Sequence, residues 1–303
     1  MRVALTGASG LLGHYVHAEI SAAHEVVAID RVAVPEHGTK VVDMQDRAGL
    51  AAALEGCEAV IHLAAIDSAR AASEDEFYEV NVMGAWNLLS TAERLGLRRA
   101  VVASSVSALG LRPESPPVAL PIPVDQPQRP IGAYGLSKQA GETLAAGFAA
   151  RGTLEVACLR PCLVTFPRHV PEWAAMVAQF DGVKLPDGIV VPETKTAEAI
   201  APTRACVSPE DTARAFAAAL TAKLDGFVRC YVAGIDSLSA GSTVANIAKG
   251  FGTAPPVTRP DLFAAIPNAN PFDLEPARIA LGWQPRDRWA DVVARWVRTH
   301  GRG

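Results

Sequence analysis

The chain opens with the stretch that decides its fold, MRVALTGASGLLGHYVHAEISAAHEVVAID, residues 1–30. An apolar strand over 2–6 runs into a glycine loop and a helix, and a second strand over 25–30 ends on Asp30. Three glycines recur in the loop at three-residue intervals: Gly7, Gly10 and Gly13. A strand, a loop of this spacing, a helix and a second strand closed by an acid are together typical of a dinucleotide-binding unit.

Each glycine of this loop has its own physical task. Gly7 permits the tight turn, Gly10 lets the backbone approach a pyrophosphate, and Gly13 lets the helix pack against the strand. The helix N-terminus offers free N–H groups and a partial positive charge to the phosphates. The carboxylate of Asp30, at about the 20-residue remove expected of this unit, can accept both ribose hydroxyls of the adenosine. The sequence therefore predicts a bound dinucleotide.

Size and composition narrow the class of protein. The 303 residues are 50% hydrophobic, which suits one large globular domain and a smaller one. No apolar run approaches the ~20 residues of a membrane span, and the strand and loop at the start do not resemble a secretory signal. The net charge of -4, without a Lys/Arg cluster, argues against nucleic-acid binding. We expect a cytoplasmic protein with no membrane and no nucleic-acid partner.

Cysteine and histidine usage gives no sign of a metal or of disulfides. The five cysteines are scattered, odd in number and form no Cys-x-x-Cys, which suits buried thiols in a reducing cytosol. His14 and His17 lie three residues apart on the first expected helix, but no third ligand is nearby in the sequence. We therefore expect a solvated helix face there and no metal site.

Short apolar strands alternate with longer helical stretches, which predicts an α/β fold of Rossmann type with a doubly wound parallel sheet. We expect strands over 2–6, 25–30, 40–43, 59–64, 99–104, 154–160 and 227–233. Helices are expected near 11–22, 46–54, 75–95, 134–150 and 208–223.

The alternation loosens after residue 165. The prediction is therefore an NAD-binding Rossmann domain over 1–165 and 206–235, interleaved with a small substrate-binding domain over 166–205 and 236–303.

Residues 111–130 break the pattern, with seven prolines and no helical periodicity. A connection this long inside a compact domain is usually functional or disordered. It ends four residues before Tyr134, so we expect it to form a wall of the active-site cleft.

The second decisive motif is Tyr134-Gly135-Leu136-Ser137-Lys138. Residues four apart share a helix face, so the phenol and the ammonium can act together. A free tyrosine has a pKa of about 10, and lowering it to about 7 takes ~4 kcal/mol. We expect Lys138 to supply much of this, with a further contribution from the positive nicotinamide ring of an oxidised cofactor. Tyr134 could then take a proton from an alcohol or return one to a carbonyl.

Ser104 and Ser105 end the strand expected over 99–104. Ligands of doubly wound sheets bind at the carboxyl ends of the strands. A serine hydroxyl there can orient the reacting oxygen toward Tyr134, although a strand-end serine can also simply cap the backbone.

In combination these motifs resemble the extended short-chain dehydrogenase/reductase superfamily, and within it the NAD-dependent epimerase/dehydratase family. The resemblance runs over most of the chain and rests on Thr6 to Gly13, Asp30, Asp43-Met44, His62-Leu63-Ala64-Ala65, Asn81-Val82-Met83-Gly84, Asn87-Leu88-Leu89, Ala103-Ser104-Ser105, Tyr134 to Lys138, Leu159-Arg160-Pro161 and Asp273 to Pro285.

The resemblance implies a role for each matching residue. The catalytic residues would be Ser105, Tyr134 and Lys138. NAD would be bound by Gly7, Ser9, Gly10, Leu11, Leu12, Gly13, Asp30, Arg31, Asp43, Met44, Leu63, Ala64, Ala65, Asn81, Ala103, Tyr134, Lys138 and Pro161. Substrate contacts would come from Ser105, Val106 and Arg204. Asp30 favours NAD over NADP because it would repel a 2′-phosphate, whereas Arg31 could neutralise one.

Departures from the family pattern bear on the substrate. Nucleotide-sugar members carry an asparagine three residues after the arginine that ends the sixth strand, and here that position is Leu163. The Asp-Glu pair of the dehydratases is replaced by Val106-Ser107. Arg204 occupies a position where the family often has a phosphate-binding arginine. The resemblance thus leaves room for an anionic substrate with a carboxylate in place of a phosphate.

Three functions remain open at this point. The first is an NAD-dependent oxidoreductase acting on a sugar or sugar acid, as in uronate dehydrogenases, which also lack the asparagine. The second is a nucleotide-sugar epimerase that retains its NAD, and the third is a non-catalytic dinucleotide sensor, which would not need Tyr134 and Lys138. The family also implies a homodimer formed through the helices near 75–95 and 134–150.

Overall fold

The computed structural model describes residues 1–68, 70–189 and 202–300 of the 303-residue chain. Within these residues a parallel sheet has the strand order β3-β2-β1-β4-β5-β6-β9. Its strands are β1 Arg2–Thr6, β2 Glu25–Asp30, β3 Lys40–Val41, β4 Ala59–His62, β5 Arg99–Ala103, β6 Glu155–Pro161 and β9 Phe227–Val232. The expected doubly wound parallel sheet is confirmed.

The strand order reverses beside β1, and this reversal decides where ligands bind. The chain moves outward from β1 through β2 to β3 and then returns to place β4 on the other side of β1. The connections after β1 and β4 therefore leave in opposite directions and open a crevice at the carboxyl ends of the strands. Gly7, Asp30 and Leu63 follow or end these strands, so they meet at that edge.

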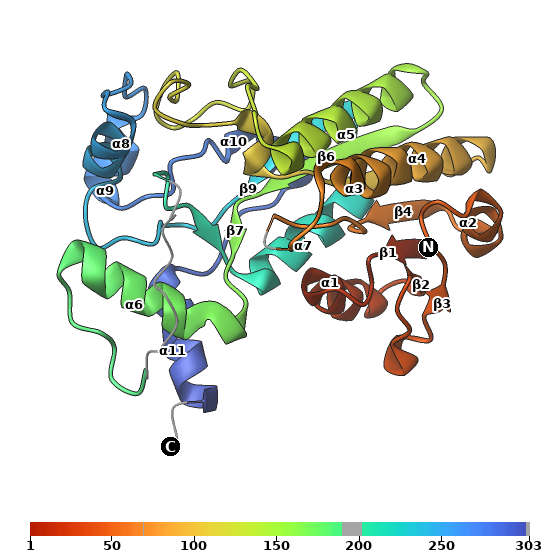
Figure 1. Ribbon diagram of the computed structural model, residues 1–303, viewed down its shortest axis with the longest axis horizontal. Helices are drawn as coiled ribbons and strands as arrows, with labels where there is room; N and C mark the ends of the chain where they lie inside the picture. Colours follow the sequence, from red (N-terminus) through yellow and green to blue (C-terminus); the bar gives the residue numbers. More distant parts are fainter. Residues whose placement is uncertain (69, 190–201, 301–303) are drawn as a thin grey trace.

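Helices cover both faces of the sheet (Figure 1). On one face α1 packs against α7, and on the other α4 packs against both α2 and α5. Each face has its own apolar core, because the strands alternate side chains between the two. These helices are α1 Leu11–Ser21, α2 Arg47–Leu54, α4 Gly84–Arg94, α5 Ala133–Ala150 and α7 Pro209–Thr221.

The helix expected near 75–95 is interrupted by a different winding. A short α3, Glu74–Phe77, continues into a π-helical segment η2, Tyr78–Met83, before α4 begins. The sequence pattern did not predict this segment. A π-helical turn offsets the register of the helix and is common at functional sites. Here it buries the polar side chain of Asn81.

The remaining elements gather at the other end of the molecule (Figure 1). A two-stranded parallel pair, β7 Leu163–Val164 and β8 Cys206–Val207, leads into this region. Its helices are α6 Val170–Asp181, α8 Thr243–Phe251, α9 Pro260–Ala265 and α11 Trp289–His300, whereas α10 Glu275–Leu281 packs against β9 and α7. The division into two domains at the expected boundaries stays a prediction.

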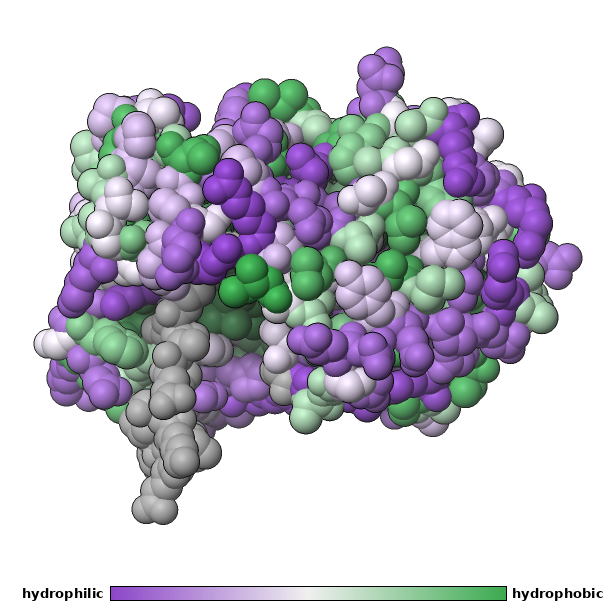
Figure 2. Space-filling model, turned by 45° about the horizontal axis from the view of Figure 1, so that its top comes forward, coloured by the Kyte–Doolittle hydropathy of each residue, from purple (hydrophilic) through white to green (hydrophobic). Residues whose placement is uncertain are grey.

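Several simpler expectations can be compared with the structure. The five cysteines are buried and unpaired, as expected. No helix among the described residues is long and apolar enough to cross a bilayer. Figure 2 shows hydrophilic and hydrophobic residues mixed over one face of the molecule. Strand β3 ends at Val41, two residues earlier than expected, because the Asp43 side chain accepts a hydrogen bond from the Gln45 N–H at 2.8 Å and begins a turn.

Candidate active site

A pocket of about 320 Å³ lies at the carboxyl ends of β1, β2 and β4. Residues predicted to bind the cofactor form most of its wall: Gly7, Ser9, Gly10, Asp30, Arg31, Asp43, Met44, Leu63, Ala64 and Ala65. The pocket also contains residues that sequence reasoning missed, namely Val32, Val42, Ile66, Arg70 and Val80. These lie next to the motifs in the sequence or on η2, and only the assembled sheet brings them together.

The glycine loop has the geometry that a close backbone approach requires. Gly7 has a φ of +74°, and a Cβ there would lie 2.6 Å from the Ala64 nitrogen. A Cβ on Gly13 would lie 2.2 Å from the Gly7 oxygen, so the helix and the strand touch at this point. Gly10 keeps an ordinary φ of -75° and lines the pocket, and a Cβ there would lie 3.2 Å from the Gly7 oxygen.

The start of α1 and the end of β2 fit a dinucleotide. Within the described chain α1 has no side-chain cap and no acidic residue in its first turn, so its N–H groups are available to a phosphate. The Asp30 carboxylate accepts hydrogen bonds from the Ser9 N–H at 3.0 Å and the Val32 N–H at 3.2 Å. These bonds fix the carboxylate, whose remaining lone pairs can accept the ribose hydroxyls.

The wall beside Met44 is held by Asn87, whose motif was recognised without a role. Its Nδ2 donates to the Met44 oxygen at 3.0 Å. This bond ties the segment after β3 to α4. It positions Asp43 and Met44, two of the residues expected to bind NAD.

Eight of the residues predicted to bind NAD lie outside the described wall of this pocket: Leu11, Leu12, Gly13, Asn81, Ala103, Tyr134, Lys138 and Pro161. Three of them, Asn81, Ala103 and Lys138, share a small adjoining cavity of about 20 Å³ with Ala64 and Ala65. Their contact with a cofactor stays a prediction.

Asn81 uses its whole amide to hold neighbouring segments. Its Oδ1 accepts from the Ile66 N–H at 2.7 Å, and its Nδ2 donates to the Ile66 oxygen and to Ser137 Oγ, both at 3.0 Å. The side chain therefore locks the loop after β4 against α5. Asn81 therefore supports the site through its neighbours, and its predicted contact with NAD stays a prediction.

The structure brings the three predicted catalytic residues together. Lys138 is buried, its Nζ donates to the Ala103 oxygen at 3.0 Å, and it lies 5.7 Å from the centre of the Tyr134 ring. Ser105 caps a short 3-10 helix, η3 Val106–Leu109, and hydrogen-bonds Tyr134. Because α5 begins at Ala133, the phenol sits in the first turn of the helix, facing the end of β5.

The electrostatics of this trio differ from the expectation in one respect. Burial raises the pKa of Tyr134 to about 12, although the hydrogen bond from Ser105 acts in the opposite direction. Burial also lowers the pKa of Lys138 to about 8, because an ammonium is poorly solvated there. The expected lowering of the Tyr134 pKa is therefore absent, because desolvation, with a smaller contribution from Asp67, outweighs the hydrogen bond of Ser105. Tyr134 holds its proton in this state.

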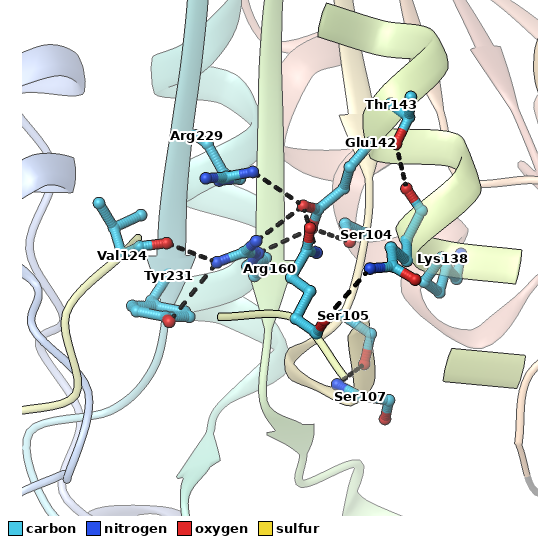
Figure 3. Close-up of polar contacts among 12 residues, drawn as sticks. Ser104, Ser105, Ser107, Val124, Lys138, Glu142, Thr143, Arg160, Arg229 and Tyr231 are labelled. Carbon is cyan, nitrogen blue, oxygen red and sulfur yellow. Dashed lines mark hydrogen bonds and ion pairs between the residues drawn. The ribbon is translucent and has the colours of Figure 1, made fainter. Parts of the chain in front are cut away.

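Ser104, adjacent to Ser105, points into a separate buried network (Figure 3). Successive residues at the end of a strand face opposite ways, so the two hydroxyls are separated. Ser104 Oγ donates to Glu142 Oε1 at 2.5 Å. Glu142 also accepts two bonds of 2.7 Å from Arg160, whose side chain is fully buried.

This network anchors the proline-rich segment. Arg160 Nη1 donates to the Val124 oxygen at 2.8 Å, and Gln128 Nε2 donates to Glu142 at 2.8 Å. Tyr231 on β9 donates from its hydroxyl to the Pro123 oxygen at 2.9 Å, and Figure 3 shows Arg160 beside Val124 and Tyr231. Glu142 lies one turn after Lys138 on α5, so the same helix carries the trio and the anchor. Sequence reasoning gave neither Glu142 nor Arg160 this role.

A second, wider cleft of about 650 Å³ opens beside Tyr134. Both ends of the proline-rich segment line it, through Leu111, Arg112 and Pro130, so the expected wall is confirmed. Val106 also lines the cleft. Aromatic side chains reach it from three other segments of the chain: Phe77, Phe251 and Phe272.

Arg204 lies apart from the described lining of this cleft. Its Nη1 pairs with Asp181 Oδ1 at 2.6 Å, and its guanidinium lies 5.5 Å from the centre of the Phe180 ring. The backbone has a φ of +46°, which is uncommon for a residue with a side chain. The Arg204 guanidinium is thus paired with Asp181 at the end of α6. Its contact with a substrate remains a prediction without geometric support.

The pair His14 and His17 gains a neighbour that the sequence did not reveal. His37, in the short η1 helix Pro35–His37, lies 3.3 Å from His14 between ring nitrogens and stacks on His17 with ring centres 4.0 Å apart. The face is therefore less solvated than expected at His17. Among the described residues no group of three or more His, Cys, Asp or Glu side chains could hold a metal ion.

Residues 3–234 match the model of the NAD dependent epimerase/dehydratase family. The chain belongs to this family. It is 35% identical over 167 residues to L-arabinose 1-dehydrogenase (NAD(P)(+)) of Haloferax volcanii, covering 52% of this chain and 65% of that enzyme. It is 27% identical over 165 residues to a uronate dehydrogenase of Pseudomonas syringae pv. tomato, covering 52% and 58%. The chain therefore spans less than two thirds of either relative.

The fold is shared with solved structures of the epimerase/dehydratase group. MoeE5 in complex with UDP-glucuronic acid and NAD superposes with a TM-score of 0.71 at 24% identity, covering 99% of both chains. Leu163 is the residue at which the sequence led us to expect a departure from the nucleotide-sugar pattern. It begins β7 and pairs in register with Cys206.

Proposed function

We propose that the protein is an NAD-dependent dehydrogenase that oxidises a hydroxyl group of a sugar or sugar acid. The observation that carries the proposal is the convergence of Ser105, Tyr134 and Lys138 between a pocket that fits a dinucleotide and a cleft beside Tyr134. A non-catalytic sensor would need the pocket but not the trio.

Ser105, Tyr134 and Lys138 each have a role in the proton transfer. NAD, when bound, supplies the hydride acceptor at its nicotinamide ring. The Ser105 hydroxyl holds the reacting oxygen, and the Tyr134 oxygen takes the hydroxyl proton as the carbon is oxidised. The substrate alcohol thus becomes a carbonyl. Tyr134 must first lose its own proton to solvent, and Lys138 stabilises the resulting phenolate, because its ammonium is fixed near the ring by the Ala103 oxygen. Accepting the substrate proton then returns Tyr134 to the neutral phenol.

Net oxidation with release of NADH is favoured over an internal redox cycle. An epimerase must retain its ketone while the sugar turns over in the site, and a bound diphosphate serves as the anchor. Leu163 removes one such anchor, so a ketone or lactone product would leave more easily. The resemblance to L-arabinose 1-dehydrogenase and to uronate dehydrogenase supports the same direction.

A nucleotide-sugar epimerase that retains its NAD is the second candidate. The cleft of about 650 Å³ favours it, because this volume leaves space beyond a single sugar ring. The chain is 32% identical over 146 residues to an epimerase of Escherichia coli O157:H7 that acts on an undecaprenol-linked sugar diphosphate.

For the assembly we propose a homodimer, formed by α4 and α5 with their copies. Tyr78 and Met83, large apolar side chains beside α4, are exposed in the single chain, which supports a contact there. Light scattering that finds only monomer at micromolar concentration would refute the dimer. We also propose a cytoplasmic location, which the five unpaired thiols support.

The function is tested by following NADH absorbance with NAD and three classes of substrate: neutral aldoses, hexuronic acids and nucleotide sugars. The proposal expects NADH in stoichiometric amounts from an aldose or a hexuronic acid. Interconversion of two nucleotide sugars with no free NADH would reject it in favour of the epimerase.

A further inference from the structure

The cleft beside Tyr134 has one cation among its described lining residues. Its two charged residues there are Arg112, at the start of the proline-rich segment, and Glu74, at the start of α3. The remaining described lining residues are apolar or neutral. An anionic substrate that reaches Tyr134 would therefore meet Arg112 in this cleft, not Arg204, whose guanidinium Asp181 engages.

Arg112 is held in place before any ligand arrives. Its Nη1 donates to the Gly110 oxygen at 3.0 Å and to the Arg129 oxygen at 2.6 Å. Arg112 therefore links the two ends of the proline-rich segment, which we call its neck. Its own backbone exchanges two hydrogen bonds with Ser115, at 2.8 and 3.3 Å. The neck is tight, since a Cβ on Gly110 would lie 2.2 Å from the Arg129 oxygen. The guanidinium therefore loses little freedom on binding.

On its Nε side, the Arg112 guanidinium has a weakly interacting partner within the chain. Arg112 Nε lies 3.6 Å from Glu114 Oε2, which is too long for a hydrogen bond, and the Glu114 side chain is 74% exposed. Such an exposed pair contributes little. The Nε and Nη2 donors form the planar fork that matches a carboxylate in two parallel hydrogen bonds. A substrate carboxylate can displace Glu114 from this edge.

We propose that Arg112 binds a carboxylate of the substrate, which makes the substrate a sugar acid. This inference rests on the dehydrogenase proposed above and narrows its substrate class. Glu74, the other charged residue of the described lining, sets the opposite preference: it repels a carboxylate and accepts hydrogen bonds from sugar hydroxyls. Together the two charges orient the acid group toward the proline-rich segment.

The test compares KM and kcat for a hexuronic acid and for the neutral aldose of the same ring configuration. In Arg112→Gln, loss of the charge-assisted pair raises KM for the acid about 10- to 100-fold and leaves KM for the neutral sugar unchanged. Arg129→Gln is the matched control. It removes one positive charge from the same neck, and its exposed side chain lies outside the described lining of the cleft.

Two further variants test carboxylate binding by Arg112 even if Arg112→Gln disturbs the structure of the neck. Arg112→Lys retains the charge and loses the fork, so we expect a smaller rise in KM for the acid. Glu114→Gln removes the internal competitor and lowers KM for the acid. NAD affinity is measured for each variant and should match the wild type, and the melting temperature shows how far Arg112→Gln disturbs the neck.

Failure of this inference differs from failure of the proposed function. If no sugar or sugar acid yields NADH, the dehydrogenase itself is rejected. If the wild type oxidises only neutral sugars, or if Arg112→Gln changes KM for both substrates equally, the dehydrogenase stands and the role of Arg112 is overturned.

Discussion

The buried pair of Glu142 and Arg160 gives the sharpest prediction about stability. Glu142→Gln keeps the shape of the side chain and removes its charge, which leaves the fully buried guanidinium of Arg160 without a counter-ion. Breaking a buried ion pair in this way costs about 3–5 kcal/mol. With an unfolding entropy of about 2.1 cal/mol/K per residue, the melting temperature of the 303-residue chain falls by roughly 5–8 °C.

The pH dependence gives this prediction a second readout. Burial would raise the pKa of Glu142, but the hydrogen bonds and charge of Arg160 outweigh it and hold the pKa below its ordinary 4.5. A depressed pKa in the folded state means that the ionised carboxylate stabilises the protein fully above pH 4.5, the unfolded value. This contribution is lost as the pH falls through the folded value. The difference between wild type and Glu142→Gln should therefore be largest near neutrality and shrink in acid.

Differential scanning calorimetry between neutral pH and the acid limit measures both effects. Arg229→Gln is the control, because Arg229 makes a longer bond of 3.3 Å to Glu142 and is 29% exposed, so its loss should cost much less. A Glu142→Gln protein that melts at the wild-type temperature at neutral pH, or a difference that grows in acid, would refute the reasoning.

Three further predictions concern the site. NAD should bind more tightly than NADP because the Asp30 carboxylate repels a 2′-phosphate; tighter NADP binding in a titration would show that Arg31 dominates. Lys138→Met should reduce both kcat and NAD affinity, and a loss of kcat alone would contradict its predicted contact with NAD. Arg204→Ala, which the sequence alone would predict to weaken binding of a sugar acid, should leave that KM unchanged because Asp181 already engages the guanidinium; steady-state kinetics with a hexuronic acid decide.

The parts of the fold that the sequence predicted are those with local signals. A few consecutive residues are enough to recognise each of three features: the glycine loop, the apolar strands and the Tyr134 to Lys138 motif. The π-helical segment at Tyr78–Met83 left no such signal, because its flanking residues keep an apolar pattern compatible with one continuous helix. The structure was needed to show the offset that buries Asn81.

The charged groups of the site could not be paired from the sequence. Glu142 and Arg160 lie 18 residues apart on a helix and a strand, and only the assembled sheet brings them within 2.7 Å. The sequence predicted Arg204 as the anion contact, and only the structure showed Asp181 beside it and Arg112 in the lining of the cleft. The pKa of Tyr134 depends on how deeply the phenol is buried, a quantity that motif spacing does not carry.

The central claim is that Tyr134 is the acid/base of an NAD-dependent oxidation. Tyr134→Phe tests it most directly, because the change removes the ionisable oxygen and keeps the ring. Turnover should fall about 10²- to 10⁴-fold, as expected for loss of a general base, while the Kd for NAD measured by titration stays at the wild-type value. Near-normal NADH production by Tyr134→Phe would contradict the account.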